Sequence, residues 1–170
     1  YIVGDKVFDK AMKTYFRKWS FKHPRPTDVI RIFEEESGMV LDWFYNYWVF
    51  STKTIDYGIQ KVAGNKKKTR ITLHRTGKIP MPCEVEVTYE NNKKEIFYIP
   101  MGLMKGEKEG KFTTQKPWDW VNPTYEFDIN KNVGNIKKVS LKFKNQVADV
   151  NSDNDTVEID HQFDFVYDRG

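Results

Sequence analysis

The hydrophobic residues of this chain follow two different periods, and the change between them falls near residue 52. In residues 1–52, apolar side chains recur at the three- and four-residue spacing of amphipathic helices. The first such series is Val7, Phe8, Ala11, Met12, Tyr15, Phe16 and Trp19. It predicts a helix capped by Asp5 that ends before Pro24 and Pro26, because proline lacks the amide hydrogen that a helix needs.

Two further helices are predicted before residue 52. Thr27 is a suitable cap for the second, which runs through Ile30 and Phe33 and ends at Gly38. The third helix is expected to place one apolar face inward, formed by Leu41, Phe44, Tyr45, Trp48 and Val49. Three helices of this size have too little surface to cover so many aromatic side chains against one another. We therefore expect an exposed apolar surface on them, and either self-association of the isolated chain or a first helix that is partly loosely ordered.

From residue 53 onward, apolar and polar residues alternate with the period of β-strands. The alternating runs lie at residues 71–73, 85–89, 125–129 and 139–143. Turn residues separate them, and the pair Asn91-Asn92 predicts the clearest hairpin. Short alternating strands at this spacing predict an antiparallel β-sandwich. The expected class is therefore α+β, with a helical unit at 1–52 and a β-sandwich at 53–170.

Composition narrows the possible partners. Hydrophobic residues make up 39% of the 170 residues and aromatic residues 15%, which is enough for a packed core. Because no apolar run approaches the roughly 18–20 residues that span a bilayer, we predict no membrane span. The net charge is +4, and the densest basic run, Lys66-Lys67-Lys68, reads as a solvated hairpin tip. We therefore expect no nucleic-acid partner.

The residues that commonly carry catalysis form no recognisable site. The histidines His23, His74 and His161 include no pair four residues apart, so no helix presents two zinc ligands. The single cysteine, Cys83, is expected to be a structural thiol. Consecutive residues on a helix point in different directions, so the acidic run 34–36 is not a catalytic pair. We predict no catalytic, cofactor-binding or metal-binding residue in this chain.

A calcium-loop lookalike occurs near the C-terminus. Asp149, Asn151 and Asp153 occupy the first, third and fifth positions of such a loop. The sixth position holds Asn154 instead of glycine, and the twelfth holds Asp160 instead of glutamate. A polar turn between edge strands is therefore the preferred interpretation.

Several segments together resemble a known enzyme family. They are Gly4-Asp5-Lys6-Val7-Phe8-Asp9-Lys10-Ala11-Met12-Lys13-Thr14-Tyr15-Phe16, Phe21-Lys22-His23-Pro24, Pro26-Thr27-Asp28, Ser37-Gly38 and Leu41-Asp42-Trp43-Phe44-Tyr45-Asn46-Tyr47-Trp48. This pattern resembles the end of the catalytic domain of gluzincin zinc aminopeptidases, the family of alanyl aminopeptidases and leukotriene hydrolase. With Lys22-His23-Pro24 and Thr54-Ile55-Asp56-Tyr57, it is most similar to bacterial members. The resemblance extends to about Asp149, and the tail from Asn151 has no place in it.

The resemblance implies a non-catalytic part of a larger enzyme. In that family the His-Glu-x-x-His helix, the distal Glu ligand and the Gly-x-Met-x-Asn strand all precede this segment. The oxyanion-stabilising tyrosine precedes it too, and Tyr1 and Tyr15 do not match its Tyr-x-x-Gly-Ala setting. Zinc and the peptide substrate would thus belong to the parent protein, whose remainder would be this chain's partner. The chain alone is expected to bind no zinc and to be inactive.

Two expectations concern the rest of the protein. The N-terminus, Tyr1-Ile2-Val3-Gly4, is neither a signal peptide nor a start methionine, so we expect it to lie inside a longer polypeptide. Because bacterial relatives are often exported, the resemblance also implies a periplasmic or exported location.

An independent β-sandwich that binds carbohydrate or protein is the alternative function. In that hypothesis Trp118 and Trp120 form an exposed platform on which a sugar ring stacks. The same residues, in Pro117-Trp118-Asp119-Trp120, equally fit the packed beginning of a strand. A His-Glu-x-x-His sequence upstream in the parent gene would decide for the aminopeptidase.

Overall fold

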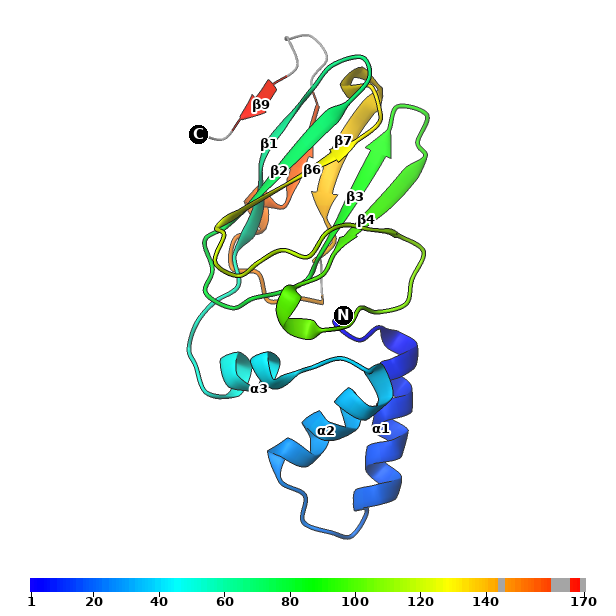
Figure 1. Ribbon diagram of the computed structural model, residues 1–170, viewed down its shortest axis with the longest axis vertical. Helices are drawn as coiled ribbons and strands as arrows, with labels where there is room; N and C mark the ends of the chain where they lie inside the picture. The colour runs from blue at the N-terminus through cyan, green and yellow to red at the C-terminus, as the bar shows by residue number, and fades with distance from the viewer. Residues whose placement is uncertain (144–145, 160–165, 169–170) are drawn as a thin grey trace.

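The helices gather at one end of the molecule and the strands at the other (Figure 1). The computed structural model describes residues 1–143, 146–159 and 166–168, the last range by its backbone alone. Its helices are α1 (Asp5–Trp19), α2 (Pro26–Ser37) and α3 (Asp42–Val49). None of the described helices is both long and apolar enough to cross a membrane.

The strands follow α3 and form two sheets. Their bounds are β1 (Tyr57–Gly64), β2 (Thr69–Arg75), β3 (Cys83–Tyr89), β4 (Lys94–Ile99), β5 (Thr113–Thr114), β6 (Thr124–Ile129), β7 (Ile136–Leu141), β8 (Thr156–Glu158) and β9 (Val166–Asp168). One sheet has the order β6-β2-β1-β9 and the other β5-β4-β3-β7-β8. The pairings are antiparallel except for the short parallel pair β4 and β5. The predicted α+β class with antiparallel sheets is therefore confirmed.

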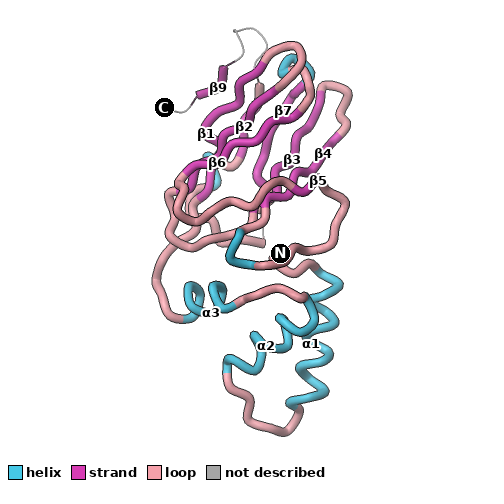
Figure 2. The backbone as a smooth tube through the Cα atoms, in the orientation of Figure 1, coloured by secondary structure: helices cyan, strands magenta, loops and turns pink. Residues whose placement is uncertain are grey.

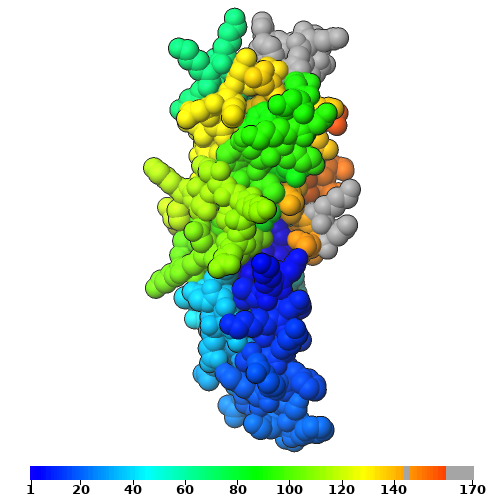
Figure 3. Space-filling model, turned by 90° about the vertical axis from the view of Figure 1, so that its right-hand side faces the viewer, coloured from blue at the N-terminus to red at the C-terminus, as the bar shows by residue number. Residues whose placement is uncertain are grey.

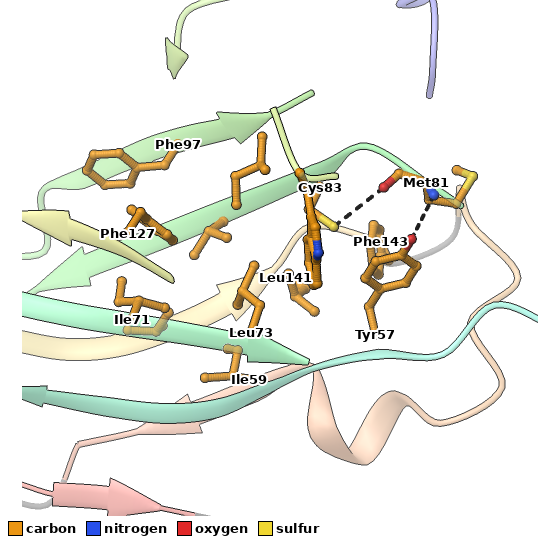
Figure 4. Close-up of a cluster of buried hydrophobic side chains, with 14 of the residues drawn as sticks. Tyr57, Ile59, Ile71, Leu73, Met81, Cys83, Phe97, Phe127, Leu141 and Phe143 are labelled. Atoms are coloured by element: carbon orange, nitrogen blue, oxygen red, sulfur yellow. Dashed lines mark hydrogen bonds between the residues drawn. The ribbon is translucent and has the colours of Figure 1, made fainter. Parts of the chain in front are cut away.

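A hydrophobic core joins the two sheets. Figure 4 shows Ile71 and Leu73 of the first sheet facing the same cluster as Leu141 of the second. The rings of Phe97 on β4 and Phe127 on β6 lie 5.5 Å apart, a direct contact across the sheets. Alternation along each strand explains this arrangement, because every second side chain points to the same face.

The helical part contributes few residues to this core. They are Val3, Met39, Leu41 and Trp43, three of which lie outside the helices themselves. The chain thus changes from helices to strands between Val49 and Tyr57. The division into domains 1–52 and 53–170 stays a prediction.

The hairpins agree with the sequence. Asn91 and Asn92 form the turn between β3 and β4, and Asn92 adopts a left-handed φ of 61°. The basic run 66–68 lies exposed in the turn between β1 and β2, where the Asn65 side chain accepts two backbone hydrogen bonds.

The predicted helix starts need correction, whereas one predicted stop is confirmed. The N-cap of α1 is Gly4, and Asp5 is its first helical residue. The N-cap of α2 is Arg25, whose backbone N–H donates to Asp28 at 2.6 Å, and Pro26 starts the helix. Proline suits that first position because no intrahelical partner awaits its missing N–H. Gly38 ends α2 with φ 69°, as expected of a glycine cap.

The apolar faces predicted for α1 and α3 are covered only in part. On α1, the small residues Ala11 and Thr14 are buried and allow α2 to approach, which leaves the neighbouring aromatic positions outside. On α3 the buried side chain is Trp43, while Trp48 and Val49 are exposed. Spacing along a helix identifies an apolar face, but the size of the side chains decides which edge of it is covered.

Candidate functional site: an apolar surface on the helices

An apolar groove of about 360 Å³ lies where the helices meet the sheets. Its walls come from the N-terminal segment, α1, α2 and α3. The lining residues are Tyr1, Ile2, Val3, Phe8, Val29, Ile30, Phe33, Leu41, Phe44, Trp48, Met81 and Gln146. Figure 2 shows the N-terminus between the helices and the strands. A preformed concave apolar site of this size is a typical place for a ligand or partner side chains.

Aromatic contacts, one of them between helices, line the groove. Phe8 of α1 contacts Phe33 of α2 with 5.6 Å between ring centroids. On α3, Phe44 stacks on Trp48 at 5.4 Å. The backbone N–H of Leu41 donates to the Glu34 carboxylate at 2.7 Å and ties the α2–α3 connection back to α2.

The N-terminal wall is fixed to the second sheet. The Tyr1 hydroxyl donates to the Pro82 carbonyl at 3.2 Å and accepts from the Glu84 backbone N–H at 3.1 Å. Burial is the largest cause that raises the pKa of the Tyr1 phenol well above its usual value, so this hydroxyl keeps its proton. The N-terminal wall of the groove is therefore anchored to β3.

Large apolar side chains of the helical part remain exposed to solvent. The exposed fractions are 50% for Phe8, 73% for Phe16 and 68% for Phe50. Figure 3 shows α1, in dark blue, at the surface of the helical end. The exposed apolar surface that the sequence predicts is thus confirmed. Apolar surface gathered in one region favours association with a partner, unlike single scattered residues.

Glu34, Glu35 and Glu36 point to three different partners. Glu34 binds the Leu41 backbone, Glu35 pairs with Lys18 at 2.7 Å, and Glu36 pairs with Lys10 at 2.7 Å. Each carboxylate joins α2 to a neighbouring segment, so the run is structural and presents no acid–base pair.

Cys83 and the histidines lie in separate environments. Cys83 is fully buried, and burial raises the pKa of its thiol well above the usual value, which suppresses the reactive thiolate. His23 lies in the exposed loop between α1 and α2, and His74 lies on β2. His161 falls outside the described residues.

The calcium-loop lookalike forms an acidic cluster beside β1. Asp149 accepts the backbone N–H groups of Tyr57 at 3.0 Å and Asn151 at 2.9 Å. The Asn154 side chain donates to Asp56 at 3.0 Å. Burial, then the nearby charges of Asp149 and Asp56, raises the pKa of Asp155 to about 7.

The donor set of this cluster does not fit a metal site. Asp149 already holds two backbone amides, and the would-be twelfth ligand, Asp160, falls outside the described residues. Across the ranges that the structure describes, no three His, Cys, Asp or Glu side chains gather closely enough to hold a metal ion. Neither calcium nor zinc is therefore assigned to these residues.

The tryptophan platform is corrected by the structure. Trp118 is 5% exposed, contacts the ring of Tyr57 at 5.4 Å, and donates its indole N–H to the Asn122 carbonyl at 2.9 Å. Trp120 is covered by the Arg75 guanidinium, 3.6 Å from its ring. Pro117-Trp118-Asp119-Trp120 thus packs against the sheets, and the two rings form no exposed stacking platform.

Two features of the site carried no readable sequence signal. Tyr1 reaches Glu84 across 83 positions, and Lys108 donates to the Tyr1 carbonyl at 2.7 Å across 107 positions. Contacts between residues so distant along the chain leave no local pattern. Only the surplus of aromatic residues in the predicted helices pointed to the groove.

Comparison with known proteins adds no relative. No protein-family model matches the chain, and no curated protein matches it.

Proposed function

We propose that this chain is the C-terminal, non-catalytic portion of a zinc-dependent aminopeptidase that removes N-terminal residues from peptides. In this proposal, α1 to α3 are the last helices of the catalytic domain, and the two sheets are the layers of a β-sandwich that braces it. The observation that supports the proposal is the open apolar groove between the helices and the sheets. The remainder of the enzyme would fill it.

The contrast between the two ends of the molecule favours this division of roles. The sheets bury their own apolar faces against each other, with Ile59, Ile71 and Val85 fully buried. The helices bury far less, and α2 has a single buried hydrophobic residue, Ile32. A helix that buries so little of its apolar face gains most of its stability from packing that a larger domain provides.

The proposal assigns no catalytic step to this chain. Zinc, the general base and the recognition of the peptide N-terminus would reside in the preceding part of the enzyme. The described residues offer no three-ligand zinc site, so their role would be to position that part.

The parent gene gives the most direct test. We expect a His-Glu-x-x-His sequence within a few hundred residues upstream of Tyr1. The purified parent protein should bind zinc and hydrolyse an alanyl arylamide, whereas the 170-residue chain should do neither. An upstream sequence without the motif would contradict the proposal, as would one zinc per 170-residue chain accompanied by turnover.

Substitutions in the groove test the role of the helices within the parent protein. Phe33→Asp places a charge on the groove wall and should lower the melting temperature and activity of the parent together. Val121→Asp is the matched control, because Val121 is 84% exposed and does not line the groove. Equal effects of the two substitutions would count against a covered groove.

The alternative, an independent binding module, loses its carbohydrate platform because Trp118 is buried. A module that binds protein would use the same groove. The upstream sequence distinguishes these two functions, because only the aminopeptidase requires the zinc motif.

A further inference from the structure

The helix α1 carries an apolar stripe that lies largely outside the groove. Phe8, Met12 and Phe16 are spaced four residues apart and are 50%, 41% and 73% exposed. Residues at this spacing form one continuous ridge on a helix. Phe8 reaches the groove, but Met12 and Phe16 do not line it. These two instead line a shallow hollow with Lys13 and Arg17.

A row of charged residues runs beside this stripe. It consists of Asp5, Asp9, Lys13 and Arg17, which are again four residues apart. Its N-terminal half is acidic and its C-terminal half is basic. Within the described part of the chain, none of the four takes part in an ion pair.

Two of the three remaining basic residues of α1 show the contrast. Lys10 pairs with Glu36, and Lys18 pairs with Glu35, both on α2. The side of α1 that faces α2 therefore has its charges matched within the chain. All four residues of the row beside the stripe are exposed, and Arg17 also donates to the Thr14 hydroxyl at 3.4 Å.

We propose that the stripe is the interface at which this chain pairs with a second copy of itself, with the two α1 helices antiparallel. A two-fold axis near Met12 would place Phe8 beside Phe16 of the second copy. The same axis would place Asp9 beside Lys13 of the second copy, and Asp5 beside its Arg17. The surface is thus complementary to itself, as a two-fold interface requires.

The charges of the row favour a second copy of this chain as the partner. An antiparallel second copy meets every charge of the row with its opposite, whereas in a parallel two-fold pair the two rows would lie on opposite edges of the interface and would not meet. A uniformly acidic or basic partner would match only half of the row. A single pair of helices buries less than the roughly 800 Å² per partner of a standard interface, so the dimer should be weak and concentration-dependent.

The inference is independent of the proposed function. It concerns the 170-residue chain as such and the outer ridge of α1, whereas the proposed function rests on the groove. A monomeric chain would refute the dimer and leave the aminopeptidase proposal standing. A parent gene without the zinc motif would refute the aminopeptidase proposal and leave the dimer standing.

Sedimentation equilibrium over a range of concentrations tests the interface. The wild-type chain should show a reversible monomer–dimer equilibrium. Phe16→Ser should weaken dimerisation by about ten-fold or more, because it removes a ring buried twice across the two-fold axis. Val121→Ser is the control, since it removes an apolar side chain that is 84% exposed and lies outside α1, and it should leave dimerisation unchanged.

A charge exchange tests the antiparallel orientation. Asp9→Lys alone and Lys13→Glu alone each place like charges together and should weaken self-association. Mixing the two variants restores opposite charges at both pairs, so a heterodimer should form as readily as the wild-type dimer. Circular dichroism checks that α1 stays helical in both. A monomeric wild type, a dimer indifferent to Phe16→Ser, or a mixture without recovery would each overturn the proposal.

Discussion

Lys108 and Glu84 form an ion pair that is almost completely withdrawn from solvent, with 8% and 11% of their side chains exposed. The Lys108 ammonium also donates to the Tyr1 carbonyl at 2.7 Å and lies 4.2 Å from the centroid of the Tyr1 ring. The pair therefore joins three distant segments: the N-terminus, β3 and the loop after β4. A buried charge that loses its partner is far more costly than an exposed one.

We expect Lys108→Met to lower the free energy of unfolding by about 3–5 kcal/mol. The substitution leaves the Glu84 carboxylate buried, and its remaining ion pair is the longer one with Lys142, at 3.9 Å. Lys94→Met is the matched control. Lys94 pairs with Glu86 at 2.8 Å but is 59% exposed, so its loss should cost no more than about 1 kcal/mol. Urea denaturation measures both. Equal losses in the free energy of unfolding would show that burial of the Lys108–Glu84 pair does not determine how much the pair stabilises the fold.

Stability should fall as the pH rises toward 7 because of Asp155. Its pKa is raised from 3.8 to about 7 in the folded chain, mainly by burial and then by Asp149 and Asp56. Between these values the folded state binds more protons than the unfolded state, so its advantage is lost as pH increases. Asp155→Asn should be more stable than the wild type at pH 8 and similar to it at pH 4.

Thermal melting across pH 4–8 measures this effect. Asp119→Asn, at an exposed position, is the control and should follow the wild-type curve. A pH profile of Asp155→Asn that parallels the wild type would contradict the raised pKa of this carboxyl group.

Local patterns in the sequence predicted the three helices, four of the strands and the α+β class, but gave no alternating run at β1, β5, β8 or β9. Alternation at residues 85–89 and 139–143 predicted β3 and β7, because a strand between a core and solvent needs that period. Gly38 predicted the end of α2 because few other residues adopt a left-handed φ without cost.

The failures concern choices that depend on distant residues. Trp118 could equally have been exposed or packed, and it is buried against Tyr57, which is far away in the chain, and against Tyr125. On the apolar face predicted for α1, Ala11 and Thr14 are the buried residues because they let α2 approach closely, while Phe8, Met12 and Phe16 stay exposed. A periodic pattern does not show which of its side chains are small enough to let a neighbouring helix approach.

Gly77 should not tolerate a side chain. A Cβ at this position would lie 2.3 Å from the Asp56 backbone nitrogen and 2.8 Å from the Thr54 carbonyl oxygen. Both are backbone atoms of the segment that leads from the helices into β1, and the Gly77 N–H donates to the Asp56 carbonyl at 3.0 Å. Gly77→Ala should therefore destabilise the chain by about 1–3 kcal/mol through overpacking.

Gly102→Ala is the matched control for this substitution. A Cβ at Gly102 would meet only the Asp119 carboxylate oxygen at 3.6 Å, an ordinary contact. Its effect on the free energy of unfolding should stay within about 0.5 kcal/mol. If both alanine variants unfold at the same urea concentration as the wild type, the close approach at Gly77 is not a constraint on the fold.

Removal of residues 1–52 should leave the sheets folded but less stable. The two sheets bury residues such as Ile59, Leu73 and Val87 against each other without help from the helices. The truncation also removes Val3, Met39, Leu41 and Trp43 from the edge of the core, together with the Tyr1 carbonyl that Lys108 binds. We therefore expect a cooperative thermal transition at a lower temperature, with a β-type circular dichroism spectrum and resistance to proteolysis below that transition. A truncated chain that is unfolded by both measurements would mean that the helices and the sheets form one inseparable unit, and it would favour the independent binding module over the aminopeptidase portion.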